Sequence, residues 1–344
     1  MNSIKSYELH TAPNRRQLFN ELQPKVWRES DMVRQWVVAD PEICIEMLRS
    51  SHLVIPDQSK VLDLLEKATG QSFENLRLAN RFLPAFMEGP EHAELRRGLA
   101  TYLMSALKRL DEILPALTEL HLSALKTKGI VDIYNAVARP FVCDILSTVI
   151  GQKLPNEILN LQLGNIFPLY KSPAQWRQLN ADYGVALEFL HNGLEFDEME
   201  LACKLCCLTF GVDSLCTLIV EAMLELFASE MPHDLPIEFP REAGVPVTFR
   251  YVREDCKFGE HEFSCGDLIR LQIQATSYSE NNSHHTSMFG AGMHSCVGRQ
   301  LSLKIWRDFA ERVNELGLKG EIVTRKHGQS HFWTRYNAVE VRLM

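Results

Sequence analysis

Residues 289–301 read Phe289-Gly290-Ala291-Gly292-Met293-His294-Ser295-Cys296-Val297-Gly298-Arg299-Gln300-Leu301. Two glycines allow a tight loop in which backbone N–H groups converge. Cys296 follows them, directly before an amphipathic helix predicted over Leu301–Leu316. A thiol at the start of a helix feels the positive end of the helix dipole, which lowers its pKa and favours the thiolate. Such a thiolate could be a nucleophile, a redox thiol or a metal ligand, and the structural alternative is a cysteine buried beside a glycine-rich turn.

The rest of the chain shows helical periodicity with a few strand signals. Apolar residues repeat at three- and four-residue steps over Ala100–Lys126, Leu201–Phe227 and Leu301–Leu316. Alternating, β-branched stretches predict strands over Gln35–Val38, Val245–Val252, Leu268–Ile273 and Ala338–Leu343. Because no repeat and no Pro/Gly-rich linker divides the chain, the sequence predicts one mostly helical fold with a small β-rich portion.

Composition excludes several classes of protein. The 344 residues carry a formal net charge of −8, which argues against broad binding to nucleic acid. Nine cysteines without a regular framework spacing are typical of reduced thiols. The most apolar stretch, 201–227, contains four charged residues that a membrane-spanning helix tolerates badly. The N-terminal residues lack the apolar run of a signal peptide, so we expect a soluble, cytoplasmic protein with neither nucleic acid nor membrane as a partner.

The cysteine loop resembles the haem-ligand loop of the cytochrome P450 family, Phe-Gly-x-Gly-x-His-x-Cys-x-Gly-x-x-Leu, and matches it at every defined position. The resemblance implies a compacted, mainly α fold with a small β-rich lobe, of the soluble bacterial type. It implies one domain over residues 1–344, with the likeness running from about 36 to 343. It also implies haem b, held by the thiolate of Cys296, which donates electron density that favours O–O bond cleavage. Phe289 would shield the sulfur, His294 would reach a haem propionate, and three loop glycines would adjoin the cofactor: Gly290, Gly292 and Gly298.

Three further residues match family positions that hold the propionates. Glu88–Arg97 resembles the family's Asp-Pro-Pro-Glu-His-x-x-x-Arg segment. His92 and Arg96 are four residues apart, so they share one helical face and could both donate to a carboxylate. The alternative for such a pair alone is a solvated charged face. Arg250, in a strand that resembles the one after the family's Glu-x-x-Arg helix, would be a third partner of the propionates.

The helix that activates oxygen in the family departs from its usual pattern, Ala-Gly-x-Asp/Glu-Thr-Thr. The matching residues are Phe210-Gly211-Val212-Asp213-Ser214. Gly211 is expected to let the helix open locally, and Phe210 and Gly211 are expected to line the substrate pocket. Asp213 and Ser214 keep an acid and an alcohol, the pair that would relay protons to dioxygen. The alternative is a back-bonded serine beside a solvated aspartate.

Several segments are shorter than in the family. Little chain remains before Phe289 for the family's meander. Leu154–Leu194, which corresponds to the substrate lid, and Gly211–Glu238 also look compressed. The family's Glu-x-x-Arg pair could be Glu238 and Arg241, although Pro240 between them fits a helix badly. A compressed lid predicts an open pocket, or a substrate that a protein partner presents.

The resemblance implies a haem-thiolate monooxygenase that oxidises a small or carrier-bound organic substrate in specialised metabolism. Electrons would come from a ferredoxin or flavodoxin and its reductase. The alternatives are a peroxygenase, dehydratase or isomerase with the same cofactor, or a non-catalytic haem-binding relative. Two other groups are assigned structural roles: the cysteines at 203, 206 and 207, and His284-His285.

Overall fold

The computed structural model describes residues 15–30, 34–167, 171–191, 197–228, 234–240, 244–278, 287–328 and 335–344. Its backbone divides into two compact units. The β-rich unit comprises Met1–Pro56, Phe239–Cys296 and His327–Arg335, and the helical unit comprises Asp57–Glu238, Val297–Lys326 and Tyr336–Met344. The expectation of a single domain remains a prediction.

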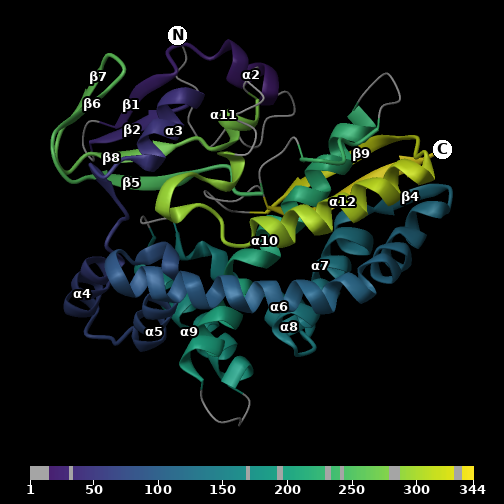
Figure 1. The fold of residues 1–344 in the computed structure, drawn as a ribbon, viewed down its shortest axis with the longest axis horizontal. Coiled ribbons are helices and arrows are strands. Elements are labelled where there is room, and N and C mark those ends of the chain that lie inside the picture. The colour runs from purple at the N-terminus through teal and green to yellow at the C-terminus, as the bar shows by residue number, and fades with distance from the viewer. Residues whose placement is uncertain are drawn as a thin grey trace. The chain divides into compact units, whose positions relative to one another are not determined.

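A five-stranded sheet forms the centre of the β-rich unit, with the order β1-β2-β8-β5-β3 (Figure 1). Strands β2 and β8 run parallel, and the other neighbouring pairs are antiparallel. A separate hairpin pairs β6 with β7. The elements of this unit are α2 (Arg15–Glu21), β1 (Val26–Ser30), β2 (Gln35–Val38), α3 (Pro41–Arg49), β3 (Leu53–Val54), β5 (Thr248–Val252), β6 (Cys256–Phe258), β7 (His261–Phe263), β8 (Leu268–Leu271), α11 (Gln274–Ser277) and η6 (Gly292–His294).

The sequence Asp40-Pro41 explains why β2 turns directly into α3. The Asp40 carboxylate accepts hydrogen bonds from the backbone N–H groups of Glu42 and Ile43, both at 3.0 Å. Pro41 occupies the first turn, where its missing N–H costs nothing. The buried face of α3 then packs on one side of the sheet, in a core that includes Met47, Ile269 and the cysteine-loop residue Ala291.

Long helices build the helical unit. In α6 the buried positions recur every three or four residues along the helix, as an amphipathic helix requires: His92, Leu95, Leu99, Leu103, Ala106, Leu110, Leu114, Thr118 and Leu122. The elements are α4 (Gln58–Thr69), α5 (Glu74–Phe82), η1 (Pro84–Phe86), α6 (Gly89–Leu122), η2 (Ser123–Lys126), β4 (Gly129–Asp132), η3 (Tyr134–Ala138), α7 (Arg139–Ile150), α8 (Asn156–Leu159), η4 (Leu163–Ile166), α9 (Pro173–His191), α10 (Glu198–Ala228), α12 (Arg299–Leu316), β9 (Gly320–His327) and β10 (Tyr336–Leu343). A three-stranded sheet has the order β4-β10-β9.

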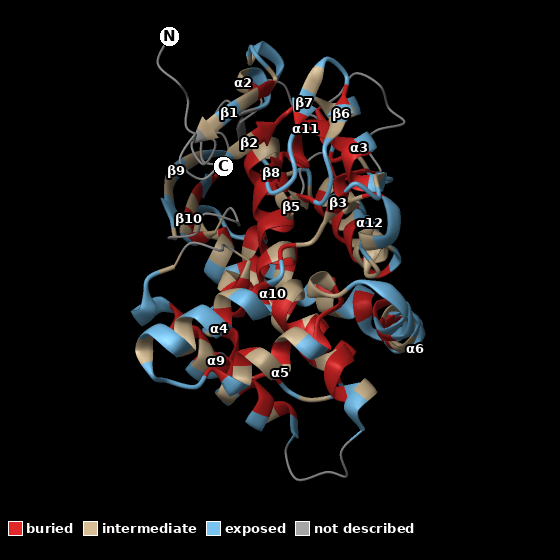
Figure 2. Ribbon diagram, turned by 90° about the vertical axis from the view of Figure 1, so that its left-hand side faces the viewer, coloured by how far each residue is buried: buried red, intermediate tan, exposed pale blue. Residues whose placement is uncertain are grey.

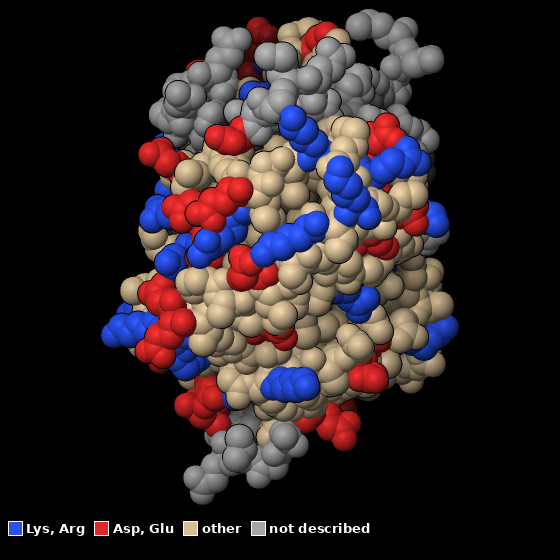
Figure 3. All heavy atoms as spheres, turned by 90° about the vertical axis from the view of Figure 1, so that its right-hand side faces the viewer, with Lys and Arg blue, Asp and Glu red and all other residues tan. Residues whose placement is uncertain are grey.

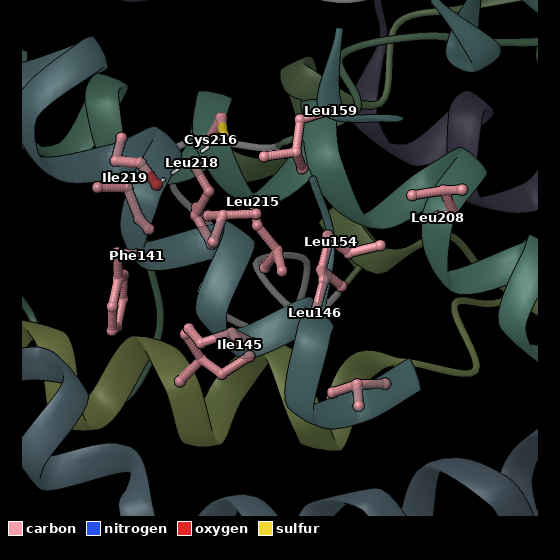
Figure 4. Close-up of a cluster of buried hydrophobic side chains, with 14 of the residues drawn as sticks. Phe141, Ile145, Leu146, Leu154, Leu159, Leu208, Leu215, Cys216, Leu218 and Ile219 are labelled. Atoms are coloured by element: carbon pink, nitrogen blue, oxygen red, sulfur yellow. Dashed lines mark hydrogen bonds between the residues drawn. The ribbon is translucent and has the colours of Figure 1, made fainter. Parts of the chain in front are cut away.

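Helix α10 is the central helix of the helical unit's core, and Figure 2 shows it largely buried, whereas α4 and α6 keep exposed outer faces. Its side chains interlock with those of α7 (Figure 4). Over Glu198–Phe227 the helix is long and apolar enough to cross a membrane, but 67% of its most apolar window is buried. A mostly buried apolar helix is what the core of a globular protein also contains.

The predicted helices and strands are present, with shifted boundaries. Helix α6 begins at Gly89, ahead of the expected Ala100, and therefore includes His92 and Arg96. Strand β5 begins at Thr248, after Pro246, because proline supplies no N–H for a strand pair. Glu238 lies in an irregular segment before Pro240, outside any helix. Arg241 and His284-His285 lie outside the described residues.

Candidate functional site

The cysteine loop is held in a fixed conformation that presents Cys296 to solvent. The backbone N–H of Cys296 donates to the Phe289 carbonyl at 2.7 Å. Gly290 and Gly292 have φ of +75° and +69°, a region that strongly favours glycine. Because Cys296 is exposed, the loop does not contain a buried structural cysteine.

Gly292 has a second reason to be glycine, which the sequence pattern does not reveal. A Cβ at this position would lie 2.7 Å from the carbonyl oxygen of Leu48 and 3.2 Å from the Cα of Arg49. The loop backbone therefore packs directly against the C-terminal end of α3.

Arg250 lies on the same face of the five-stranded sheet as the loop. It is paired with Ile269 across β5 and β8, and directly opposite residues of an antiparallel pair point to the same face. Ile269 belongs to the core that contains Ala291. Arg250 as a whole residue is only 8% exposed, and its guanidinium donates to Thr248 Oγ1 at 3.1 Å and to the Phe249 carbonyl at 2.7 Å. A buried, oriented guanidinium suits a carboxylate ligand.

His92 and Arg96 lie on the first turns of α6, in the helical unit. His92 is 4% exposed. Its pKa is lowered, chiefly because burial disfavours the imidazolium and also because of the positive charge of Arg96. A neutral imidazole still donates one N–H. The burial of His92 argues against the alternative of a solvated charged face.

The acid and alcohol expected on α10 lie on adjacent positions with different surroundings. Asp213 is 8% exposed. The Ser214 hydroxyl donates to the carbonyl of Phe210, and its distance to the Gly211 carbonyl is 3.4 Å. This is the back-bonded geometry that the sequence left open as an alternative.

The predicted local opening of α10 at Gly211 is wrong. The helix is continuous from Glu198 to Ala228. A Cβ at Gly211 would lie 2.8 Å from Cδ2 of Leu146, which belongs to α7 (Figure 4). The missing side chain therefore lets α7 approach α10 closely, and a tight helix contact explains the glycine without any distortion.

The cysteines at 203, 206 and 207 lie where an apolar core helix would place them. Cys203 and Cys206 are buried, and burial raises the pKa of Cys203 to about 12. Among the described residues no cluster of three or more His, Cys, Asp or Glu side chains could hold a metal ion. Lysines, arginines and acidic side chains are interspersed on the face that Figure 3 shows.

Sequence reasoning missed two features of the helical unit. The rings of Phe86, Phe167 and Phe210 stack in a row. Lys171 places its ammonium group 4.2 Å from the centroid of the buried Trp176 ring, and burial lowers the pKa of this lysine to about 7. A count of aromatic residues could have suggested that phenylalanine rings pack together. No local pattern, however, joins the three segments that carry Phe86, Phe167 and Phe210, because they lie far apart in the chain.

The donor set fits haem. An exposed thiol that follows two left-handed glycines suits an axial ligand, and buried basic side chains suit propionates. The β-rich unit carries Cys296, Phe289, Gly290, Gly292, His294 and Arg250, and the helical unit carries His92, Arg96, Gly298, Phe210, Gly211, Asp213 and Ser214.

Comparison with known proteins identifies the fold. No model of a protein family and no curated protein matches the sequence. Solved structures do match. P450BioI, in complex with an acyl carrier protein ligated to hexadec-9Z-enoic acid, has a TM-score of 0.75 at 14% identity, over 99% of this chain and 100% of that one. CYP109B1 from Bacillus subtilis has a TM-score of 0.69 at 14% identity, and the match covers 95% of this chain and 98% of that one. A thermophilic cytochrome P450 from Sulfolobus tokodaii has a TM-score of 0.68 at 17% identity, and the match covers 98% of this chain and 99% of that one.

The molecule is thus a mainly helical protein with a small β-rich part and an exposed cysteine in a glycine loop before a long helix. Its fold is that of the cytochrome P450 family. This confirms the resemblance and the fold class predicted from the sequence. At such low identity the likeness establishes the fold alone.

Proposed function

We propose that the protein is a haem-thiolate monooxygenase, with Cys296 as the axial ligand of haem b. The observation that carries the proposal is the loop itself: an exposed thiol, fixed by a backbone hydrogen bond, follows two glycines in left-handed conformations. When bound, the haem would supply the activation of oxygen. The substrate would be a small or carrier-bound organic molecule.

Each of the chain's own residues then has a defined task. Arg250, whose guanidinium donates to Thr248 Oγ1 and to the Phe249 carbonyl, would bind a propionate. His92 and Arg96 donate to a propionate from one face of α6, and His294 does so from the loop. Phe289 and the glycines at 290, 292 and 298 would lie against the cofactor, and Phe289 would shield the sulfur once haem is bound. Asp213 and the Ser214 hydroxyl hold and pass protons beside the reacting substrate.

The proposal also includes partners and place of action. We propose that the electrons come from a ferredoxin or flavodoxin with its reductase. We place the protein in the cytoplasm and its activity in specialised metabolism. P450BioI was solved with a carrier protein, which makes a carrier-bound substrate a reasonable form to test.

The decisive experiment is the absorption spectrum of the purified, haem-loaded protein in its reduced, CO-bound form. A red-shifted Soret band of the thiolate type supports the proposal. Cys296→Ala should abolish this band, whereas Cys265→Ala, which removes another exposed thiol, should leave it unchanged. Loss of haem binding in Arg250→Leu and His92→Phe, measured as faster haem transfer to an acceptor globin, tests the propionate assignments. A wild-type protein without the thiolate band would favour the non-catalytic alternative.

A second candidate, a peroxygenase, dehydratase or isomerase with the same cofactor, is favoured by one observation. The Ser214 hydroxyl donates to the Phe210 carbonyl, so its proton is already committed within the helix. Product formation in the absence of O₂ and in the absence of an electron donor would establish this second class.

A further inference from the structure

Three phenylalanine side chains from distant segments form what we term the aromatic stack. Phe86 ends η1, Phe167 follows η4, and Phe210 lies on α10. The ring centroids of Phe86 and Phe167 are 5.2 Å apart with planes tilted by 40°. Those of Phe167 and Phe210 are 5.3 Å apart and tilted by 45°. Aromatic pairs attract at such distances beyond what their buried area contributes.

Hydrogen bonds from two helices fix the segment that carries the middle ring. The buried Gln58 side chain of α4 donates to the carbonyl of Ile166 at 2.9 Å. The hydroxyl of Tyr183, on α9, donates to the carbonyl of Leu163 at 3.1 Å. Phe167 follows directly after this anchored turn. The stack is therefore held in place before any ligand binds, which reduces the entropic cost of binding.

The rings of the stack are more accessible than the two residues that precede Phe210 on α10. Leu208 and Thr209, which precede Phe210 on α10, are each 2% exposed. All three rings of the stack are only half-buried. Phe210 also lies one helical turn before Ser214, whose hydroxyl contacts the Phe210 carbonyl. An accessible aromatic surface thus adjoins the acid and alcohol of α10.

We propose that the aromatic stack is one wall of the substrate site and selects flat aromatic substrates over flexible alkyl chains. The inference rests on the proposed function and specifies its substrate class. An aromatic substrate gains ring–ring attraction from the stack, whereas an alkyl chain gains only apolar burial and loses rotamer freedom. The bulk of Phe210 beside Ser214 also favours a thin molecule at that turn.

The test compares two neutral alcohols with equal numbers of carbon atoms, 2-naphthol and 1-decanol, by isothermal titration calorimetry on the haem-loaded protein. We expect the wild type to bind 2-naphthol about tenfold more tightly or better. Phe210→Leu keeps an apolar side chain but removes the ring. It should weaken the affinity for 2-naphthol about five- to tenfold and change the affinity for 1-decanol by no more than about twofold. Phe189→Leu, in a half-buried position of α9 outside the stack, should change neither affinity.

A preference of the wild type for 1-decanol, or an equal loss of both ligands in Phe210→Leu, would overturn the inference. Should Phe210→Leu fail to fold by circular dichroism, Phe86→Leu removes the ring at the other end of the stack and carries the same expectation. The reduced CO spectrum of the same samples separates the two claims. Naphthol selectivity without a thiolate band refutes the proposed function alone, and a thiolate band without selectivity refutes this inference alone.

Discussion

The hydroxyl group of Ser214 donates a hydrogen bond to the backbone carbonyl of Phe210, one turn earlier in α10. The oxygen of Ser214 keeps its lone pairs, so it can still accept a proton or a hydrogen bond from a partner. The proton itself is held by a carbonyl that cannot pass it on. Any proton relay through Ser214 thus requires this hydrogen bond to break. Removal of the Ser214 hydroxyl tests whether the residue takes part in such a relay.

Ser214→Ala and Asp213→Asn should each lower O₂-dependent product formation, and the yield of product per electron consumed, by about 10²-fold if these groups transfer protons. The measurement is turnover with surrogate ferredoxin and reductase. The reduced CO spectrum serves as the control for haem binding and should not change. Unaltered coupling in both variants would show that the relay assignment is wrong.

Gly211→Ala should destabilise the protein by about 1 kcal/mol, even though alanine favours helices, because the added Cβ overlaps Cδ2 of Leu146. In a Leu146→Val background, which removes the Cδ atoms, the same substitution should become neutral or stabilising. Urea denaturation of the four proteins gives the coupling directly. An equal loss in both backgrounds would point to a role for Gly211 outside this packing contact.

Gly292→Ala should cost about 1–3 kcal/mol of folding free energy, because the residue has a left-handed φ and its Cβ would meet the Leu48 carbonyl. Gly266 is the matched control, since its φ is +87° and a Cβ there would meet nothing within 4 Å. Chemical denaturation should therefore give Gly292→Ala a clearly lower free energy of unfolding than Gly266→Ala. Equal losses would mean that backbone strain alone matters at 292.

Lys171→Met should stabilise the protein at pH 6 and lose this advantage as the pH rises toward 10. Burial lowers the pKa of Lys171 from 10.5 to about 7, so between these values the unfolded chain binds the additional proton. The free-energy cost of holding the charged Lys171 ammonium in the folded protein is fully present below pH 7 and declines as the pH rises above 7. We expect a gain of about 1–3 kcal/mol at pH 6 by urea denaturation. Lys60→Met, at a lysine side chain that is 81% exposed, should show no such pH dependence.

Local sequence signals predicted much of the fold. The apolar spacing predicted helices α6 and α12, and their buried faces match it. The face of Arg250 follows from strand alternation once the pairing of β5 with β8 is known. That pairing is a long-range property and has no local signature.

The candidate site was less predictable for the same reason. The glycines of the cysteine loop indicate a tight turn, but the contact of Gly292 with Leu48 joins segments from opposite ends of the chain. Gly211 shows the limit of reasoning by resemblance, because close packing against Leu146 and a local opening of the helix both favour glycine. The aromatic stack combines three segments that no periodicity connects.

The parallel pairing of β2 with β8 has a consequence for biosynthesis. A ribosome releases β2 and α3 long before it releases β8 and the cysteine loop. Until β8 emerges, one edge of β2 has no neighbour, and the end of α3 has no loop to pack against. Strand β2 therefore keeps an open sheet edge until β8 has been synthesised, and the cysteine loop can pack against the end of α3 only after that.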